Sequence, residues 1–400
     1  MKDPAMTSNN AQASATTDRR ALLRGMALAV PALGAAGLAG CASAGAAGGT
    51  SGGTSNTSNA SNASNASASS DWQRHASPEA AGFSSAKLKT MEAALYPLET
   101  SAMMIVKGGK IAWSYGDLDV SSYLASARKS IVSMLYGKYV ENGTINLDRT
   151  MGELGIDDIG VLTAAEKTAT VRDLLTARSG VFHPPGSPGS TAGAPARGAH
   201  PRGSYFYYNN WDFNVVGAVF EKLTGRTIFA AFRDELAVPL QLQDFDFSRQ
   251  RMLGYKPARS QYGAYHFFLS CRDMARLGVL MANGGKWNGQ QLVPANWVRE
   301  MTTTRVTPAQ TRMDFGYAYL WWKPGEVRTA PAWRDSFLAL GNYGQNILVM
   351  PANDVVVVHR RYVSDEFAIA RNLGETQIDK VGVSNDQFMK VCDLMVAAMA

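Results

Sequence analysis

The sequence predicts a mixed α/β (α+β) domain with an antiparallel sheet built from both chain ends, flanked by helices, and an inserted, mostly helical subdomain. Three observations support this class. β-Branched and aromatic residues flank a Gly-Gly turn at 102–116, and two more β-rich runs flank the turn at 351–354. Between these ends, residues 126–260 carry apolar residues mostly at helical spacing. Strands near both ends therefore imply one shared sheet with a helical insertion.

The elements follow in order along residues 72–400. Helical spacing at 83–96, with Ser84 as the expected N-cap, precedes the first pair of strands. The Pro-, Gly- and Ser-rich stretch 183–204 predicts a long exposed loop inside the helical part, and residues 385–399 form a closing helix. The expected division is an α/β part at 72–120 and 261–400, and a helical part at 121–260.

Residues 1–41 are expected to be an export signal with a lipobox. An arginine pair at 19–20 precedes the apolar stretch 25–41, which is too short and too rich in Ala and Gly for a stable membrane span. The pair resembles a twin-arginine signal, and Leu-Ala-Gly-Cys at 38–41 resembles the lipobox of bacterial lipoproteins; a plain secretory signal is the alternative. We therefore expect an exported protein, periplasmic or anchored to the membrane by lipid on Cys41.

The segment 42–71 is expected to be a flexible tether. It is a low-complexity run of Gly, Ser and Asn with repeated Ser-Asn-Ala triplets. Such a composition buries too little apolar area to offset chain entropy. Its root-mean-square reach is roughly 30 Å, which suits a domain held away from a membrane surface.

Composition and charge exclude several classes of function. The 400 residues are 46% hydrophobic, which is enough for a large core. The net charge of +6 comes from 39 basic and 33 acidic residues without a basic run, so we expect no nucleic-acid partner. Three cysteines and five scattered histidines form no zinc motif, so we expect no metal and no cofactor.

Ser126 and Lys129 are the first candidates for catalysis. They share one face of the helix expected at 126–140, most of which reads as buried. Backbone N–H groups in a first helical turn are unpaired and favour a developing oxyanion. Burial disfavours a charged lysine, which can then accept the serine proton. Ser84 and Lys87 have the same spacing, but no other catalytic motif follows them in the expected order, and we interpret Ser84 only as a helix cap.

Two later segments add polar groups in a consistent order. Tyr208 and Asn210 lie on a short connector just before a long helix that starts near Trp211. A phenol beside a lysine can pass on a proton, although an aromatic contact at the helix start is an equally simple explanation. Gly341, at the start of a late strand, permits a substrate or oxyanion to approach the backbone; a glycine bulge at a sheet edge is the alternative.

Ordered S-x-x-K, Y-x-N and Gly-bearing third motifs resemble the serine β-lactamase and penicillin-binding superfamily, in particular its class C and esterase-like branch. The resemblance covers residues 75–400 and implies a β-lactamase-like fold. Within it, "GNYGQN", "SCRDMARLGVLMANGG", "LVPANWV" and "YLWW" look particularly like serine hydrolases of the 6-aminohexanoate-dimer hydrolase type.

The resemblance implies a role for each matching position. Ser126 becomes the acylated nucleophile, Lys129 the base that activates it and Tyr208 the proton relay to the leaving group. Asn210 takes the place of the polar residue after that tyrosine. Lys-Thr-Gly of the third motif becomes Ala-Leu-Gly at 339–341, and the N–H groups of Ser126 and Asn342 form the oxyanion hole.

Ala339 departs from the family pattern. Lactamases and peptidases use a cationic or imidazole side chain there to hold a substrate carboxylate, so its loss argues for esters or amides without that carboxylate. Arg178, Arg202 and His266 are candidates for supplying the missing charge, with a structural role as the alternative for each.

The function predicted from the sequence is hydrolysis of a small-molecule ester or amide through an acyl-enzyme on Ser126. Three alternatives stay open: a β-lactamase or D,D-peptidase, a 6-aminohexanoate-oligomer amidase, and a noncatalytic lipoprotein that binds muropeptides. Substrate length, stereochemistry and oligomeric state do not follow from the sequence.

Overall fold

A seven-stranded antiparallel sheet forms the centre of the part of the chain that the computed structural model describes, residues 71–189, 193–325, 328–377 and 382–400. The expected export signal, most of the tether and Cys41 lie outside these residues. The strands are ordered β2 (Lys110–Gly116), β1 (Ala102–Lys107), β13 (Val355–Arg360), β12 (Gln345–Met350), β11 (Phe337–Gly341), β10 (Trp322–Pro324) and β9 (Phe315–Tyr317).

The sheet joins the two ends of the sequence, as predicted. Strand β1 pairs with its hairpin neighbour β2 on one side and with β13 on the other, with Ala102 opposite Arg360. Gly108 and Gly109 in the hairpin turn both have positive φ, 58° and 72°, a conformation that glycine adopts at little cost. The expected mixed α/β class with an antiparallel sheet is therefore confirmed.

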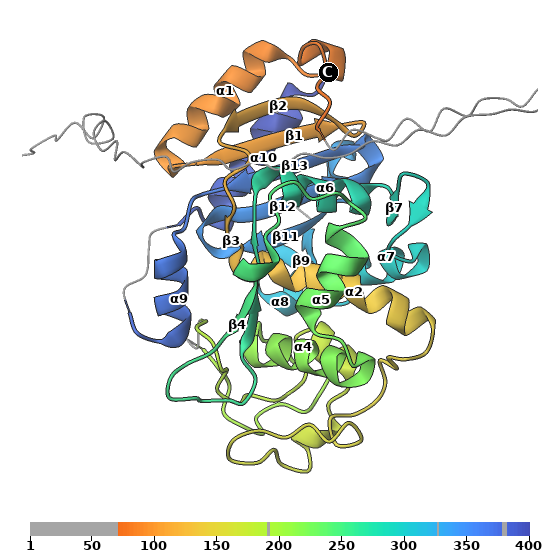
Figure 1. The fold of residues 1–400 in the computed structure, drawn as a ribbon, viewed down its shortest axis with the longest axis vertical. Helices are drawn as coiled ribbons and strands as arrows, with labels where there is room; N and C mark the ends of the chain where they lie inside the picture. Colours follow the sequence, from red (N-terminus) through yellow and green to blue (C-terminus); the bar gives the residue numbers. More distant parts are fainter. Residues whose placement is uncertain (1–70, 190–192, 326–327, 378–381) are drawn as a thin grey trace, which may run out of the picture. The chain divides into compact units, whose positions relative to one another are not determined.

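Helices cover both faces of the sheet (Figure 1). Helix α6 (Cys271–Ala282) packs closely on one face, because a Cβ on Gly278 would lie 2.4 Å from Val356 on β13. The rings of His359 on β13 and Phe388 are 5.7 Å apart, so helix α10 (Asn385–Ala398) lies on the opposite face, since these strand positions alternate. Helix α1 (Ser85–Leu95) packs beside α10.

Ser84 caps helix α1, as the sequence predicts. Its side chain accepts a hydrogen bond from the backbone N–H of Lys87 at 3.4 Å.

Among the helices of the described residues, none combines the length and the apolar character that a membrane span needs.

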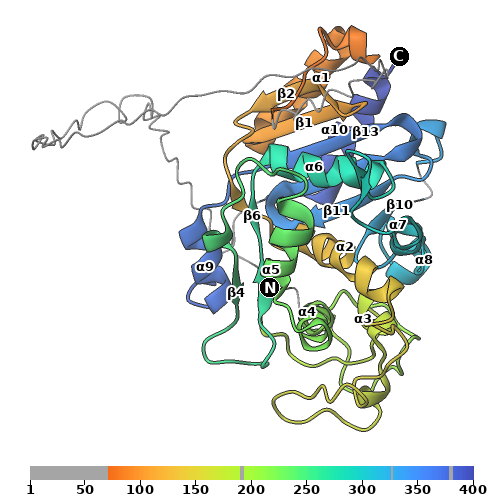
Figure 2. The same ribbon diagram turned by 45° about the vertical axis from the view of Figure 1, so that its right-hand side comes forward.

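The helical segments between β3 (Ser122–Tyr123) and β4 (Arg251–Leu253) lie below the sheet in the view of Figure 2, and α2 (Arg128–Glu141) contacts the sheet at β11. Between β3 and β4, the regular elements in the described residues are helical, but long irregular segments connect them, including 183–189 and 193–204. The helices are α2, α3 (Val171–Leu175), α4 (Asn210–Thr224) and α5 (Ile228–Phe232), which continues into a short π-helix at Arg233–Ala237.

The remaining elements are short. Strands β3 and β4 pair with β6 (Phe268–Leu269) and β5 (Ala264–His266), and β7 (Lys286–Trp287) pairs with β8 (Gln290–Gln291). The other helices are α7 (Ala295–Thr302), α8 (Pro308–Thr311) and α9 (Asp365–Leu373).

Helix α2 is buried on nearly all sides, as predicted, and its small residues have a packing reason. Ser130 and Ser133 donate hydrogen bonds, each of 2.7 Å, to the carbonyl oxygens of Leu320 and Tyr319. A Cβ on Gly137 would lie 2.6 Å from Trp297. The small side chains therefore allow close contact with the neighbouring chain, which holds the start of α2 in a fixed place.

Candidate active site

Ser126 lies in a tight 3-10 turn, Ala125–Ala127, immediately before helix α2. The expected helix start at Ser126 is therefore two residues early, and Lys129 stands in the first turn of the helix itself. The preceding residue, Ala125, has a left-handed backbone with φ 48°. Such a conformation is unfavourable for alanine, and the packing around the turn must hold it.

The side chain of Lys129 connects the predicted polar residues. Its Nζ lies 3.0 Å from Ser126 Oγ, 3.0 Å from Tyr208 Oη and 2.7 Å from Asn210 Oδ1. The same atom lies 4.2 Å from the ring centre of Tyr208 and 4.1 Å from that of Phe213. The structure thus brings together four residues that the sequence separates by up to 84 positions, 126 to 210.

Burial sets the protonation states of this group. Desolvation, followed by the positive charge of Arg128, holds the pKa of Lys129 well below its usual range. Desolvation raises the pKa of Tyr208 to about 12, although a hydrogen bond to Ser126 and the charge of Arg128 oppose the rise. Burial therefore favours the neutral form of the amine beside a protonated phenol, and the neutral form of an amine is the one that can accept a proton.

Asn210 orients the amine of Lys129. It is the first residue of α4, whose N-cap is Asn209, and its Nδ2 donates a 2.7 Å hydrogen bond to Pro188 O. Because Nδ2 is a donor, Oδ1 must be the atom that accepts from Lys129. The loop at Pro188 thereby fixes the direction of one N–H bond of the lysine.

Gly341 explains how the third motif comes close to Ser126. A Cβ at this position would lie 2.5 Å from Leu124 O and 2.9 Å from Ala127 N. The close neighbour of this glycine is therefore the backbone around Ser126, and β11 is an inner strand of the sheet, so the alternative of an edge bulge is wrong. Asn342 follows directly and lines the same cavity as Ser126.

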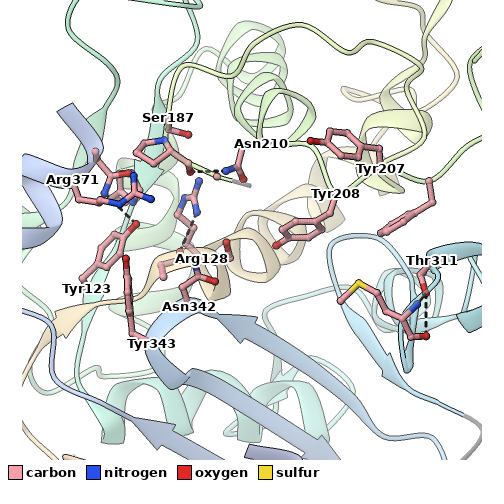
Figure 3. A pocket seen from close by; sticks show the side chains of 18 of the residues that line it. Tyr123, Arg128, Ser187, Tyr207, Tyr208, Asn210, Thr311, Asn342, Tyr343 and Arg371 are labelled. Carbon is pink, nitrogen blue, oxygen red and sulfur yellow. Dashed lines mark hydrogen bonds between the residues drawn. The ribbon is translucent and has the colours of Figure 1, made fainter. Parts of the chain in front are cut away.

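Ser126 lines a cavity of about 530 Å³. The cavity lies between the segment that follows β11 and the segments at 187–189 and 206–210. In the view of Figure 3, Tyr123, Tyr343 and Arg371 lie toward one end and Tyr207, Tyr208 and Thr311 toward the other, with Arg128 and Asn342 between them. The other lining residues are Ala125, Ser126, Ser187, Pro188, Gly189, Phe206, Asn210, His266, Arg312, Met313 and Asn372.

The three candidates for a replacement cation have different positions. His266 lines the cavity, whereas Arg202 forms an ion pair with Asp173 at 2.6 Å and Arg178 is not among the lining residues. Three arginines that the sequence did not single out also line the cavity: Arg128, Arg312 and Arg371. For Arg128 a signal existed, because it is a charged residue on a helix that otherwise reads as buried.

A metal site is not apparent in the described ranges, where no group of three or more His, Cys, Asp or Glu side chains is placed to hold a metal ion. Cys271 and Cys392 are both buried free thiols.

The chain belongs to the Beta-lactamase family, because the family model of that description matches residues 96–360, more than half of the sequence. This is a family of β-lactamase-fold serine hydrolases that includes 6-aminohexanoate-dimer hydrolase-like members. The resemblance on which the sequence analysis depends is thus confirmed.

Individual relatives are distant. The 6-aminohexanoate-dimer hydrolase of Paenarthrobacter ureafaciens is 26% identical over 162 residues, which is 38% of this chain and 38% of that protein. The chain therefore aligns with well under two thirds of that relative's length.

Two solved structures share the fold. One, from Bacillus anthracis, is provisionally assigned as a 6-aminohexanoate-dimer hydrolase; it has a TM-score of 0.55 and 18% identity, over 76% of this chain and 80% of its own. The penicillin-binding protein from Bacillus halodurans has a TM-score of 0.51 and 16% identity, over 70% of this chain and 97% of its own.

Proposed function

We propose that this chain cleaves an ester or amide bond through an acyl-enzyme on Ser126. The observation that supports this most strongly is the position of the buried Lys129 Nζ, 3.0 Å from both Ser126 Oγ and Tyr208 Oη. Asn210 accepts one N–H of the amine and Tyr208 accepts the other, so the lone pair of a neutral lysine is directed toward the serine hydroxyl.

In the acylation step, Ser126 Oγ forms a bond to the substrate carbonyl carbon as its proton passes to Lys129 Nζ. The N–H groups of Ser126 and Asn342 are proposed to hold the resulting oxyanion. Tyr208 passes a proton to the leaving oxygen or nitrogen and regains one from Lys129, and the bond to the leaving group breaks.

Deacylation repeats these transfers with water as the nucleophile. The water proton passes through Tyr208 and Lys129, and Ser126 leaves with a proton on Oγ. The free serine and the neutral lysine are restored, and the products are a carboxylic acid and an alcohol or amine.

The assignment is tested with Ser126→Ala and 4-nitrophenyl acetate or butyrate. We expect hydrolysis to be lost while the circular-dichroism spectrum and melting temperature stay close to those of the parent. Retained turnover in a folded Ser126→Ala protein would refute the assignment.

A 6-aminohexanoate-oligomer amidase is the second candidate, favoured by the names of the curated relative and of one structural neighbour. Release of amine from a 6-aminohexanoate dimer would support it. Nitrocefin turnover that exceeds ester turnover would instead favour a β-lactamase or D,D-peptidase. Peptide binding without labelling of Ser126 by a fluorophosphonate would favour a noncatalytic muropeptide-binding protein.

Export and lipid anchoring through Cys41 remain part of the proposal, as does the division of residues 72–400 into α/β and helical parts. The motif at 38–41 supports the anchor. A Cys41→Ser protein should leave the membrane fraction; equal membrane association would contradict the anchor.

A further inference from the structure

Arg128 is a buried cation without an anionic partner among the residues that the structure describes. The residue is 6% exposed, and Nη1 donates to the carbonyl oxygen of Ala125 at 3.1 Å. In the part of the chain that the structure describes, no carboxylate lies within ion-pair distance of it; the acidic groups that act on it are the phenols of Tyr123 and Tyr208. A buried charge of this kind is unfavourable unless it is matched by acceptors.

Arg360 shows what a satisfied buried arginine looks like in the same molecule. It is 2% exposed and also has no carboxylate partner among the described residues. Its guanidinium, however, donates to Gln345 Oε1 and Leu269 O at 2.5 Å, and to Ser122 O at 3.0 Å. Arg128 lacks such a set of acceptors, although it lies beside a cavity that can admit one.

His266 is a second buried polar group at the same cavity. Its side chain is 1% exposed, and neither ring nitrogen has a hydrogen bond of ordinary geometry, although the Asn372 carboxamide lies nearby. Burial and the charges of Arg128 and Lys129 hold its pKa well below the usual range. The neutral imidazole therefore retains one N–H to donate.

The charged side chains among the described residues that line the cavity are all cationic. Arg128, Arg312 and Arg371 all contribute, and no aspartate or glutamate is found among the described residues that line it. Low-dielectric walls with charges of one sign concentrate the field in a cleft and attract ligands of opposite charge. Figure 3 shows Arg128 and Arg371 on the same side of Tyr208.

We infer that Arg128 and His266 form an anion-binding subsite beside Ser126, and that the substrates are esters or amides that carry a carboxylate. The inference rests on the proposed acyl-enzyme function. A guanidinium pairs well with the two oxygens of a carboxylate, and the imidazole N–H supplies a further donor. The inference replaces the expectation, drawn from Ala339, that the substrate lacks a carboxylate. In place of a cation at position 339, Arg128 supplies the positive charge from helix α2, which directly follows the turn that holds Ser126.

The test uses two pairs of substrates that differ only in charge. Mono-4-nitrophenyl adipate and 4-nitrophenyl adipamate place the carboxylate or its neutral amide on the acyl side. The pair 3-acetoxybenzoate and 3-acetoxybenzamide places it on the leaving-group side. The measured quantity is the ratio of kcat/KM for the charged ester to that for the neutral ester, because a general effect of Arg128 on Lys129 cancels in the ratio.

In one of the two pairs, we expect the parent enzyme to prefer the charged ester and Arg128→Gln to lower the ratio about 10- to 100-fold, as for loss of a charge-assisted hydrogen-bonding partner. His266→Gln should lower it by about tenfold. Arg312→Gln is the matched control, because Arg312 lines the same cavity but its guanidinium donates to Phe206 O and stacks on Tyr205. It should change the ratio less than about twofold.

Equal ratios for the parent and Arg128→Gln in both pairs would overturn the inference. If Arg128→Gln fails to fold, competitive inhibition of the parent decides: adipate must inhibit hydrolysis of the neutral ester more strongly than adipamide, and equal inhibition overturns the inference. Ser126→Ala separates the two levels. Turnover that requires Ser126 but ignores charge refutes only the subsite, whereas turnover without Ser126 refutes the proposed function itself.

Discussion

Lys129 and Arg128 are neighbours in one helical turn, yet their environments are opposite. The amine of Lys129 lies within 3.0 Å of three side-chain oxygens and touches two aromatic rings. The guanidinium of Arg128 is also buried. The hydrogen bond that the structure gives for it goes to the backbone carbonyl of Ala125. The difference teaches that the protein itself supplies the hydrogen-bonding partners of Lys129, whereas the hydrogen bond given for the Arg128 guanidinium uses one of its five N–H donors.

The largest expected effect is loss of the proposed base. Lys129→Met should lower kcat/KM for 4-nitrophenyl butyrate by at least about 10³-fold, because the variant loses the amine that lies 3.0 Å from Ser126 Oγ and that is proposed to accept its proton. Lys138→Met on the exposed side of the same helix, where the side chain is 58% exposed, is the control and should stay within about twofold. Comparable activity of both variants would mean that Lys129 is not the base.

Removal of the relay should have the next largest effect. Tyr208→Phe keeps the ring against Lys129 but removes the hydroxyl, and should lower kcat/KM by about 10²-fold. Tyr207→Phe is the control, because it removes the hydroxyl of the neighbouring tyrosine, which also lines the cavity. If both substitutions have the same small effect in steady-state assays, the proton reaches the leaving group by another route.

The pH dependence links Lys129 and Arg128. The proposed mechanism requires neutral Lys129, so kcat/KM for a neutral ester should rise with pH through the lowered pKa of Lys129 and level off well below pH 10.5, the ordinary lysine value. The pKa of Tyr208, about 12, keeps the phenol protonated over this range. Arg128→Gln removes a positive charge that lowers the pKa of Lys129, so the rising limb should move to higher pH.

Arg312→Gln serves as the control for this shift, since Arg312 is not among the groups that perturb Lys129. If the rising limb of the pH profile is unchanged in Arg128→Gln, or shifts equally in both variants, the charge of Arg128 does not influence the pKa of Lys129.

The smallest effect concerns the contact at the turn before Arg128 and Lys129. Gly341→Ala would put a methyl group 2.5 Å from Leu124 O, so the strand or the Ser126 turn must shift. Overpacking of this kind lowers the free energy of unfolding by about 1–3 kcal/mol. Urea unfolding would measure it, and a variant as stable and as active as the parent would show that Gly341 does not hold the turn in place.

Local patterns predicted the strands β1, β2, β12 and β13 near the two ends of the domain and the helices α1, α2, α4 and α10. The apolar periodicity at α1, α2 and α10 and the Gly-Gly turn between β1 and β2 are local signals, and each element is present close to its expected bounds. The start of α2 was misplaced because a 3-10 turn and a helical first turn have similar side-chain spacing. The short strands β9 and β10 carry too few residues for a periodic pattern to be read.

The site was predictable only in part. Ser126, Lys129, Tyr208 and Asn210 were found because their motifs match a known family in order, and their distances from one another depend on tertiary packing that spacing does not encode. Arg371 lies on α9, more than 240 residues after Ser126, and nothing local marks it as facing the same cavity. The orientation of Arg128 depends likewise on which side of a buried helix remains open.

The most direct test is intact-protein mass spectrometry after rapid acid quenching with an activated ester, followed by peptide mapping. We predict one added acyl group on Ser126 in the parent protein, and none in Ser126→Ala. An adduct on another residue, or turnover in the parent without any acyl-protein species and without labelling of Ser126 by a fluorophosphonate, would contradict an acyl-enzyme at this serine.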